Sequence, residues 1–231
     1  MHRLLIILTI GLFSCGAQQV KLPEQPSDIE PLTKFFSVFE KDLVNTARVI
    51  SEQELVKNLT HLQKMNFGGQ KYYPLERESL TKMIRELSSY EYAECIVLNH
   101  SGTVIYSMYD DSIFSKKAES YTNSLGILYK NGRLGPFIFD VHEFPPMSKQ
   151  YVVFFAMPIP GDDNDGVLIA AIKAESIAKT AGIKGVFVDE EGIIRLSADH
   201  DKILTPAKNF RGKNNEKTFR YLNIEWYLSA D

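Results

Sequence analysis

The sequence predicts an α+β fold, in which a helical front half is followed by a sheet-forming back half. Two observations support this division. Apolar side chains recur at helical spacing between Leu32 and Leu43, whereas from Glu94 onward short apolar runs alternate with turn residues. The composition of the 231 residues, 44% hydrophobic and 24% charged, is that of a globular protein and excludes a fibrous or wholly disordered chain.

Residues Met1 to Ser14 have the features of a cleaved secretion signal. Arg3 is followed by an apolar run from Leu4 to Phe13, which is too short to span a hydrocarbon core that takes about 20 residues. The run ends in Leu12-Phe13-Ser14-Cys15-Gly16, which resembles the bacterial lipobox. In lipobox proteins the Cys is acylated and becomes the new N-terminus. An ordinary signal peptide with a coincidental Cys is the alternative.

The lipobox resemblance implies a lipid anchor, such as palmitate, on Cys15. Acyl chains hold a protein stably at a membrane because each buried CH₂ contributes roughly 0.8 kcal/mol. Residues 15–31 contain Pro23, Pro26 and Pro31 and few apolar side chains, so they are expected to form an extended tether. The expected location is the cell envelope, outside the cytoplasm, and the outer membrane in a Gram-negative cell, because Gly16 rather than Asp follows the Cys.

The helical front begins with the apolar stripe that starts at Leu32. The segment from Pro31 to Met65 is either one kinked helix or two helices that meet near Ser51, where Ser51 to Glu54 has the pattern of a capping box. Gly68-Gly69 predicts a break from Asn66 to Tyr73, and Pro74 is expected to start another helix that reaches about Ser89. The aromatic stripe is expected to be core rather than a cofactor site.

The sheet-forming part has five expected strands with one expected helix among them. The strands are Cys95–Leu98, Thr103–Ser107, Phe137–Val141, Tyr151–Ile159 and Val167–Lys173. The helix is expected within Ser115–Lys130, and a short helix is expected at Glu175–Thr180. The order of the strands in the sheet cannot be read from the sequence.

A weak internal repeat indicates a second, incomplete unit. Ile96 to Ser107 reads IVLNHSGTVIYS, and Val186 to Ser197 reads VFVDEEGIIRLS. In both, an apolar strand enters a turn closed by Gly, and a second apolar strand ends in Ser. Chance similarity between two hairpins is the alternative. Too few residues follow for a full copy, so Thr218–Leu222 and Ile224–Ser229 are expected to complete a truncated unit at 181–231.

Several classes of function are excluded or disfavoured. The formal charge of −3 argues against a nucleic-acid binder. The sequence has no HExxH zinc motif, no Gly-x-Ser-x-Gly elbow, no P-loop and no GxGxxG. Aligning Gly166 to the loop glycine of an EF-hand puts Gly161 at the first ligand position and Ile172 where a Glu is required. We therefore expect no enzyme activity, no metal and no cofactor.

The order of these segments resembles a Cache domain, the PAS-like extracytoplasmic sensor module of bacterial receptors. The two front helices, the hairpin Ile96–Ser107, the segment with Tyr121 and Tyr129, and the strand Phe155–Ile159 followed by a polar turn and an apolar strand carry the resemblance over residues 32–180. It implies a long N-terminal helix packed on an antiparallel sheet. The family usually continues into a membrane helix and an output domain, whereas this sequence reaches Asp231 without either.

The resemblance also directs attention to a pocket for a small organic ligand, such as an amino acid, carboxylate or amine. The pocket is expected between the strands Phe137–Val141 and Tyr151–Ile159 and the segment Tyr121–Arg133. In this site the tyrosines supply rings and hydroxyls, Arg133 holds a carboxylate, and Asp140 holds an amine. The alternatives are solvent-facing Arg133 and Asp140 and tyrosines that belong to the core. The candidate residues are Tyr106, Tyr121, Tyr129, Arg133, Asp140 and Phe155.

The leading hypothesis is therefore a membrane-anchored extracytoplasmic lipoprotein that binds a small molecule, as a sensor or for solute capture. Without an output domain of its own, such a sensor passes its state to a partner, for example a membrane receptor. The second hypothesis is an interaction or scaffold lipoprotein, whose Cache-like fold binds a protein and no small ligand. A hydrolase is the third.

Overall fold

The computed structural model describes residues 28–120, 124–143, 150–161, 166–212 and 217–229. The helices of this part are α1 (Ile29–Glu52), α2 (Leu55–Lys64), α3 (Asn66–Leu87), α4 (Leu125–Gly132) and α5 (Ala174–Thr180), with single 3-10 turns η1 (Asp111–Ile113), η2 (Ala118–Ser120) and η4 (His200–Lys202). The strands are β1 (Glu94–Asn99), β2 (Val104–Ser107), β3 (Phe137–Glu143), β4 (Tyr151–Ile159), β5 (Gly166–Lys173), β6 (Val186–Val188), β7 (Ile194–Leu196), β8 (Lys217–Tyr221) and β9 (Ile224–Ser229).

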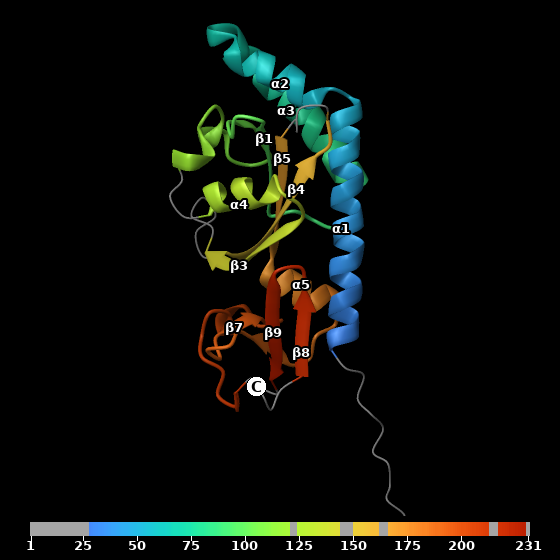
Figure 1. Cartoon of the computed structure of the whole chain (residues 1–231), viewed down its shortest axis with the longest axis vertical. Coiled ribbons are helices and arrows are strands. Elements are labelled where there is room, and N and C mark those ends of the chain that lie inside the picture. The colour runs from blue at the N-terminus through green and yellow to red at the C-terminus, as the bar shows by residue number, and fades with distance from the viewer. Residues whose placement is uncertain (1–27, 121–123, 144–149, 162–165, 213–216, 230–231) are drawn as a thin grey trace, which may run out of the picture.

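Two antiparallel sheets lie one above the other, and the long helix α1 runs beside both (Figure 1). The larger sheet has the strand order β2-β1-β5-β4-β3, and the smaller one has the order β7-β6-β9-β8. The short helix α5 connects β5 of the larger sheet to β6 of the smaller one. This arrangement confirms the predicted α+β class, with a long helix on a PAS-like sheet and a truncated second unit.

The aromatic stripe of α1 is core, as the sequence predicted, and it contacts both sheets. The ring centroid of Phe36 lies 5.4 Å from that of Phe155 in β4 and 6.0 Å from that of Trp226 in β9. Phe39 contacts Phe155 edge-on at 4.4 Å. Each such aromatic pair contributes about 0.5–1.5 kcal/mol beyond the burial of its area, so one helix fixes both sheets.

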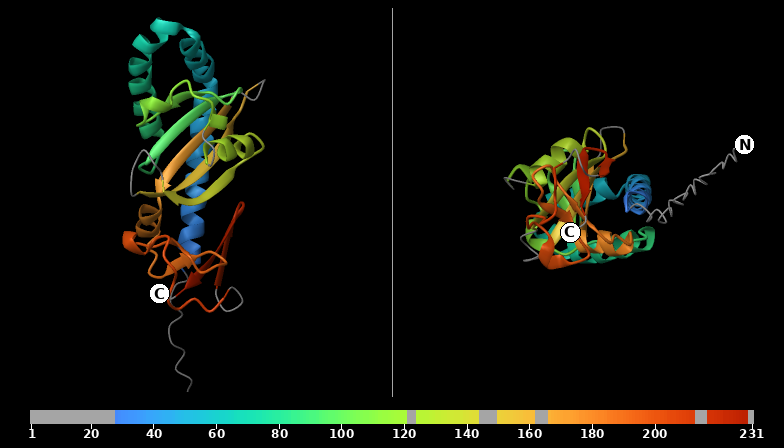
Figure 2. Two further views of the ribbon diagram at one scale, coloured as in Figure 1. Left: turned by 90° about the vertical axis from the view of Figure 1, so that its left-hand side faces the viewer. Right: turned by 90° about the horizontal axis from the view of Figure 1, so that it is seen from below.

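The opposite face of the larger sheet is covered by α4 (Figure 2, left). Leu125 and Leu128 of this helix belong to an apolar cluster with Phe154 and Val167 of the sheet. The contact is close at Gly132, where an added Cβ would lie 2.7 Å from the Cβ of Ala156. Because both faces of the sheet are buried, its strands are continuous apolar runs rather than alternating ones.

The front of the chain forms two helices before residue 65, which resolves the alternative that the sequence left open. The predicted capping box is wrong, because Ser51 lies in the last turn of α1 and α2 is preceded by Glu54 in a left-handed conformation with φ 53°. The predicted break at 66–73 is also wrong, because α3 begins at Asn66 and continues through Pro74. Packing of α3 against α2 and α1 outweighs the loss of one backbone N–H at the proline.

The helix expected from Ser115 to Lys130 is shorter and begins later than predicted. The segment before it lies along the free edge of β2 instead, since Val104 donates to the carbonyl of Lys116 at 2.9 Å and accepts from Ser115 at 2.8 Å. Ser115 takes φ 66° to enter this pairing. The exposed edge of the sheet thus obtains backbone partners that a helix would not have provided.

The internal repeat is a repeat of backbone geometry. The side chains of Asn99 and Asp189, 90 positions apart, each accept hydrogen bonds from the backbone N–H groups two and four residues later. The turns are then closed by Gly102 with φ 71° and Gly192 with φ 82°. Both turns therefore use the same device, an Asx side chain followed by a left-handed glycine.

Candidate ligand-binding site

Tyr129 of α4 and Arg133, the residue directly after this helix, contact each other. The Arg133 guanidinium carbon is 5.6 Å from the centroid of the Tyr129 ring. The Tyr129 hydroxyl donates to the carbonyl of His100 at 2.6 Å, which ties α4 to the β1–β2 turn. The ring also abuts Gly102, where an added Cβ would lie 2.9 Å from it. The structure therefore brings two of the six predicted residues together.

A surface cavity of about 490 Å³ opens beside this pair. Its lining residues are Glu119, Gly126, Tyr129, Lys130, Arg133 and Leu134. Arg133 is exposed and forms no ion pair with any residue that the structure describes, so its guanidinium is available to a carboxylate. Tyr121, a third predicted residue, falls in 121–123, outside the described residues, as does Cys15 in 1–27.

Tyr106 and Phe155 lie in the core between the larger sheet and the long helices, away from α4. The Tyr106 side chain is fully buried, and its hydroxyl is 2.9 Å from the Thr81 hydroxyl of α3. Burial raises the pKa of Tyr106. Phe155 packs between Phe36 and Phe39 of α1. The structure therefore does not bring these two residues to the cavity beside α4.

Asp140 lies at the junction of the two sheets, in the bulged part of β3. Its carboxylate accepts from the Trp226 indole at 3.4 Å and lies 3.6 Å from Arg195 Nε. Burial raises the pKa of Asp140, and the charge of Arg195 acts in the opposite direction. The cation that faces Asp140 is thus Arg195 rather than a ligand amine. The sequence predicted that Asp140 and Arg133 would line one pocket, and the structure does not bring them together.

The chemistry open to the α4 face is recognition of an anionic group next to an apolar surface. The sheet beneath α4 is filled by the apolar cluster of Leu128, Phe154 and Val167, and Gly132 leaves no gap between helix and strands. A ligand at this face binds at the rim beside Tyr129 and Arg133 or displaces α4.

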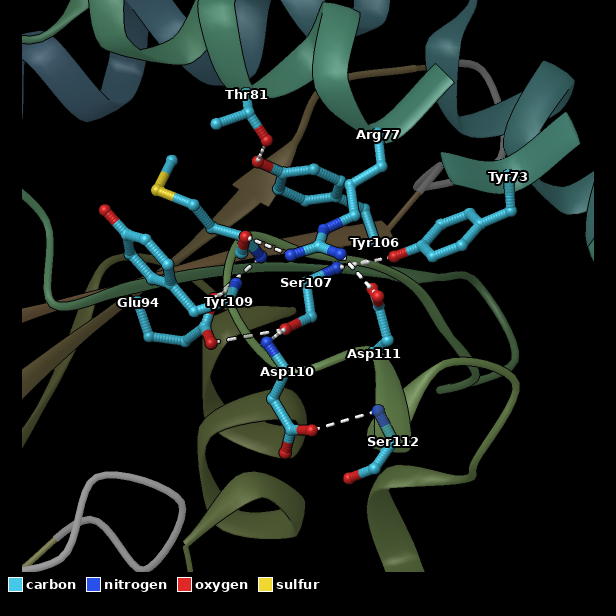
Figure 3. Close-up of polar contacts among 11 residues, drawn as sticks. Tyr73, Arg77, Thr81, Glu94, Tyr106, Ser107, Tyr109, Asp110, Asp111 and Ser112 are labelled. Carbon is cyan, nitrogen blue, oxygen red and sulfur yellow. Dashed lines mark hydrogen bonds and ion pairs between the residues drawn. The ribbon is translucent and has the colours of Figure 1, made fainter. Parts of the chain in front are cut away.

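A polar cluster that was not predicted from the sequence lies on the α3 side of the larger sheet (Figure 3). Glu94, at the start of β1, is 1% exposed, and its carboxylate accepts from the N–H groups of Cys95 at 2.8 Å and Met108 at 2.7 Å. Tyr109 N–H and the Ser107 hydroxyl donate to it at 3.3 and 3.2 Å. Burial raises the pKa of Glu94, and these hydrogen bonds partly oppose the rise. The only sequence feature that could have indicated this cluster is the carboxylate of Glu94, directly before the apolar run Cys95–Leu98.

A second open cavity, of about 650 Å³, lies above this cluster along α3. Arg77 is fixed there by the Met108 carbonyl at 2.8 Å and by Asp111 at 2.5 Å. Glu78 and Glu86 line the same cavity as Lys82 and Arg85, so charges of both signs lie along it. This mixed charge selects no single class of ligand.

Within the described ranges, no three His, Cys, Asp or Glu side chains come together as metal ligands. In the same part, no helix combines the length and the apolar character required to cross a bilayer. Cys95 is a buried free thiol, and burial raises its pKa well above the ordinary value.

Solved structures that this chain resembles include a histidine kinase sensor domain and ligand-binding domains of chemoreceptors. The V. cholerae histidine kinase DctB sensor domain matches with a TM-score of 0.55 at 14% identity, over 80% of this chain and 69% of that one. The ligand-binding domain of the Pseudomonas fluorescens chemoreceptor CtaA, in complex with L-serine, has a TM-score of 0.51 at 11% identity, over 87% of this chain and 90% of that one. The Pseudomonas aeruginosa chemoreceptor PctB, in complex with L-Arg, gives 0.54 at 11% identity, over 87% and 81%.

No protein-family model matches the sequence. The curated proteins likewise include none with significant similarity to it. At identities of 10–15% the structural likeness establishes the fold, and the chain has the Cache-type, PAS-like fold of these sensor domains. What such a domain binds depends on its own side chains rather than on its fold.

Proposed function

We propose that this protein is an extracytoplasmic sensor or solute-capture domain that binds a small amino acid or carboxylate at the α4 face of its larger sheet. The observation that carries the proposal is the exposed guanidinium of Arg133 beside the Tyr129 ring and a cavity of about 490 Å³. The fold supports it, because CtaA and PctB, which share that fold, were solved with L-serine and L-Arg bound. Arg133 takes the ligand carboxylate, and Tyr129 packs against its side chain.

A thermal-shift screen of amino acids, carboxylates and amines tests this proposal. A ligand at 100 times its Kd adds about 2.7 kcal/mol to the free energy of unfolding, which is readily measured. We expect at least one amino acid or carboxylate to raise the Tm of the wild type. If none of several hundred metabolites raises the Tm, the proposal is overturned.

The close packing beneath α4 favours a second candidate, a scaffold lipoprotein that binds a protein partner and no small molecule. Leu128 and Gly132 are already in contact with the sheet, where a ligand would otherwise insert. For this function the screen yields no hit, whereas crosslinking in intact cells yields a defined partner protein. The two results together separate the scaffold from the sensor.

We further propose that the protein is held at the membrane by lipid on Cys15, in the outer membrane if the cell is Gram-negative, with a receptor in the membrane as its partner. The lipobox-like LFSCG sequence supports this anchor. The first described helix starts beside the smaller sheet, so this end of the molecule is expected to face the bilayer (Figure 1). Mass spectrometry of membrane-extracted protein should find acylated Cys15 as the first residue. An intact Met1 terminus in the soluble fraction would exclude the anchor.

A further inference from the structure

The side chain of Asn223 binds both backbone groups of one residue in the larger sheet. The Ile138 N–H donates to Asn223 Oδ1 at 2.7 Å, and Asn223 Nδ2 donates to the Ile138 carbonyl at 2.6 Å. Ile138 lies in β3, the edge strand of the larger sheet, and Asn223 lies in the turn between β8 and β9. An amide side chain with both bonds made reproduces one rung of a β-ladder across the two sheets.

The same strand contacts α4 through its other side chains. Phe137 and Phe139 pack against the apolar cluster that contains Leu128 of α4. Ile138, between them, points to the opposite core. A displacement of α4 therefore acts directly on the two residues that flank the backbone groups held by Asn223.

Beyond Asn223, the described residues of the smaller sheet make three more polar contacts with β3. Trp226 donates to Asp140 at 3.4 Å, Arg195 reaches the carbonyl of Val141 at 3.4 Å, and Arg195 Nε lies 3.6 Å from Asp140. All three are long, and the Arg195 guanidinium binds mainly to Asp189, at 2.7 Å. The two hydrogen bonds of Asn223 are the shorter polar contacts at this junction. We expect them to couple β3 to the smaller sheet more strongly than the longer contacts do.

We propose that Asn223 is a positioning residue that transmits a displacement of α4 to the smaller sheet. The inference rests on the proposed function in one respect, that a ligand beside α4 displaces this helix. The path runs from Leu128 through Phe137 and Phe139 to Ile138, and from Asn223 into the β8–β9 hairpin. It gives a sensing site at the larger sheet a physical route to the second unit.

The test uses no ligand, so its outcome is independent of the metabolite screen. Gly132→Ala places a methyl group 2.7 Å from the Cβ of Ala156 and 2.8 Å from Val167, which forces α4 away from the sheet. Trp226 is the one tryptophan of the chain, so its emission reports on its surroundings at the junction, which include Asp140 of β3 and Phe36 of α1. We expect Gly132→Ala to change Trp226 emission in the wild-type background and to change it less in an Asn223→Ala background, where only the long Trp226–Asp140 contact still joins the tryptophan to β3.

Hydrogen exchange gives the second measurement. The Ile138 amide should exchange about fivefold faster in Asn223→Ala, because it loses its acceptor, and at the wild-type rate in Asn58→Ala on the exposed face of α2. If Gly132→Ala does not fold, Leu128→Ala replaces it. Equal changes of Trp226 emission in both backgrounds, or no change in either, would overturn the proposal.

Discussion

The carboxylate of Glu94 and the backbone N–H of Met108 lie 2.7 Å apart and join the first residue of β1 to the chain that leaves β2. The carboxylate is almost fully buried, and among the described residues it has four hydrogen-bond donors and no cation within ion-pairing distance. A charge in this position is stabilised by hydrogen-bond donors alone, and these offset only part of the rise in pKa that burial causes.

The pH dependence of folding should carry a contribution from Glu94. Its pKa in the folded protein is raised above the ordinary value of 4.5, so the folded state favours the protonated carboxyl. The contribution to the free energy of unfolding is then full below pH 4.5 and declines as the pH rises toward the folded pKa. Urea denaturation between pH 4 and 8 should show this decline in the wild type and a smaller one in Glu94→Gln.

Glu91→Gln is the matched control, because Glu91 is exposed and three residues away. It should retain the pH profile of the wild type. Glutamine at 94 keeps an acceptor for the backbone N–H groups, so Glu94→Gln is expected to fold. A profile in Glu94→Gln identical to that of the wild type would show that this carboxyl does not titrate in the range.

The contact of Gly102 with Tyr129 can be measured with two glycine variants. Gly102 and Gly182 both have positive φ, 71° and 66°, so alanine at either position costs about 1 kcal/mol of backbone strain. Only at Gly102 does the new Cβ meet a ring, whereas at Gly182 nothing lies within 4 Å. We expect Gly102→Ala to lower the free energy of unfolding by about 1 kcal/mol more than Gly182→Ala does.

The excess cost of Gly102→Ala should disappear in a Tyr129→Ala background, where the ring is absent. Chemical denaturation of the four variants completes this comparison. If Gly102→Ala and Gly182→Ala lower the free energy of unfolding equally, α4 can shift away from the β1–β2 turn at no cost. In that case Tyr129 would not fix the position of α4.

Tyr106→Phe should affect stability and leave ligand binding unchanged. The variant removes the hydrogen bond to Thr81 and lowers the free energy of unfolding by about 1 kcal/mol. The affinity for the strongest ligand from the screen should equal that of the wild type, because Tyr106 faces the long helices. A loss of affinity of tenfold or more in calorimetry would place the ligand on the α3 side of the sheet instead.

The strands were predictable because each is a short apolar run closed by turn residues, as at Glu94–Asn99 before His100. The period of two also shows which residues of a strand share a face. It does not show which face α4 covers when both faces are apolar, and this is why Tyr106 and Phe155 were assigned to the wrong side of the sheet for a site beside α4. Their rings pack on α3 and α1.

Features that depend on tertiary contacts could not be predicted from the sequence. The bulge in β3 that turns Asp140 toward Trp226 and Arg195 has no local signature. Pro74 and Gly68-Gly69 predict a break when taken alone, yet α3 is continuous because it packs against the rest of the molecule. Asn223 was likewise an ordinary turn residue in the sequence, and only the fold brings Ile138 within its reach.

Calorimetric titration of the wild type and Arg133→Ala with the strongest amino acid or carboxylate from the screen tests the central claim most directly. A charge-assisted hydrogen bond contributes about 1.5–3 kcal/mol, so Arg133→Ala should weaken binding by roughly tenfold or more. Lys179→Ala removes an exposed cation from α5 and should bind as the wild type does. Unchanged affinity in Arg133→Ala would contradict a ligand site at the α4 face.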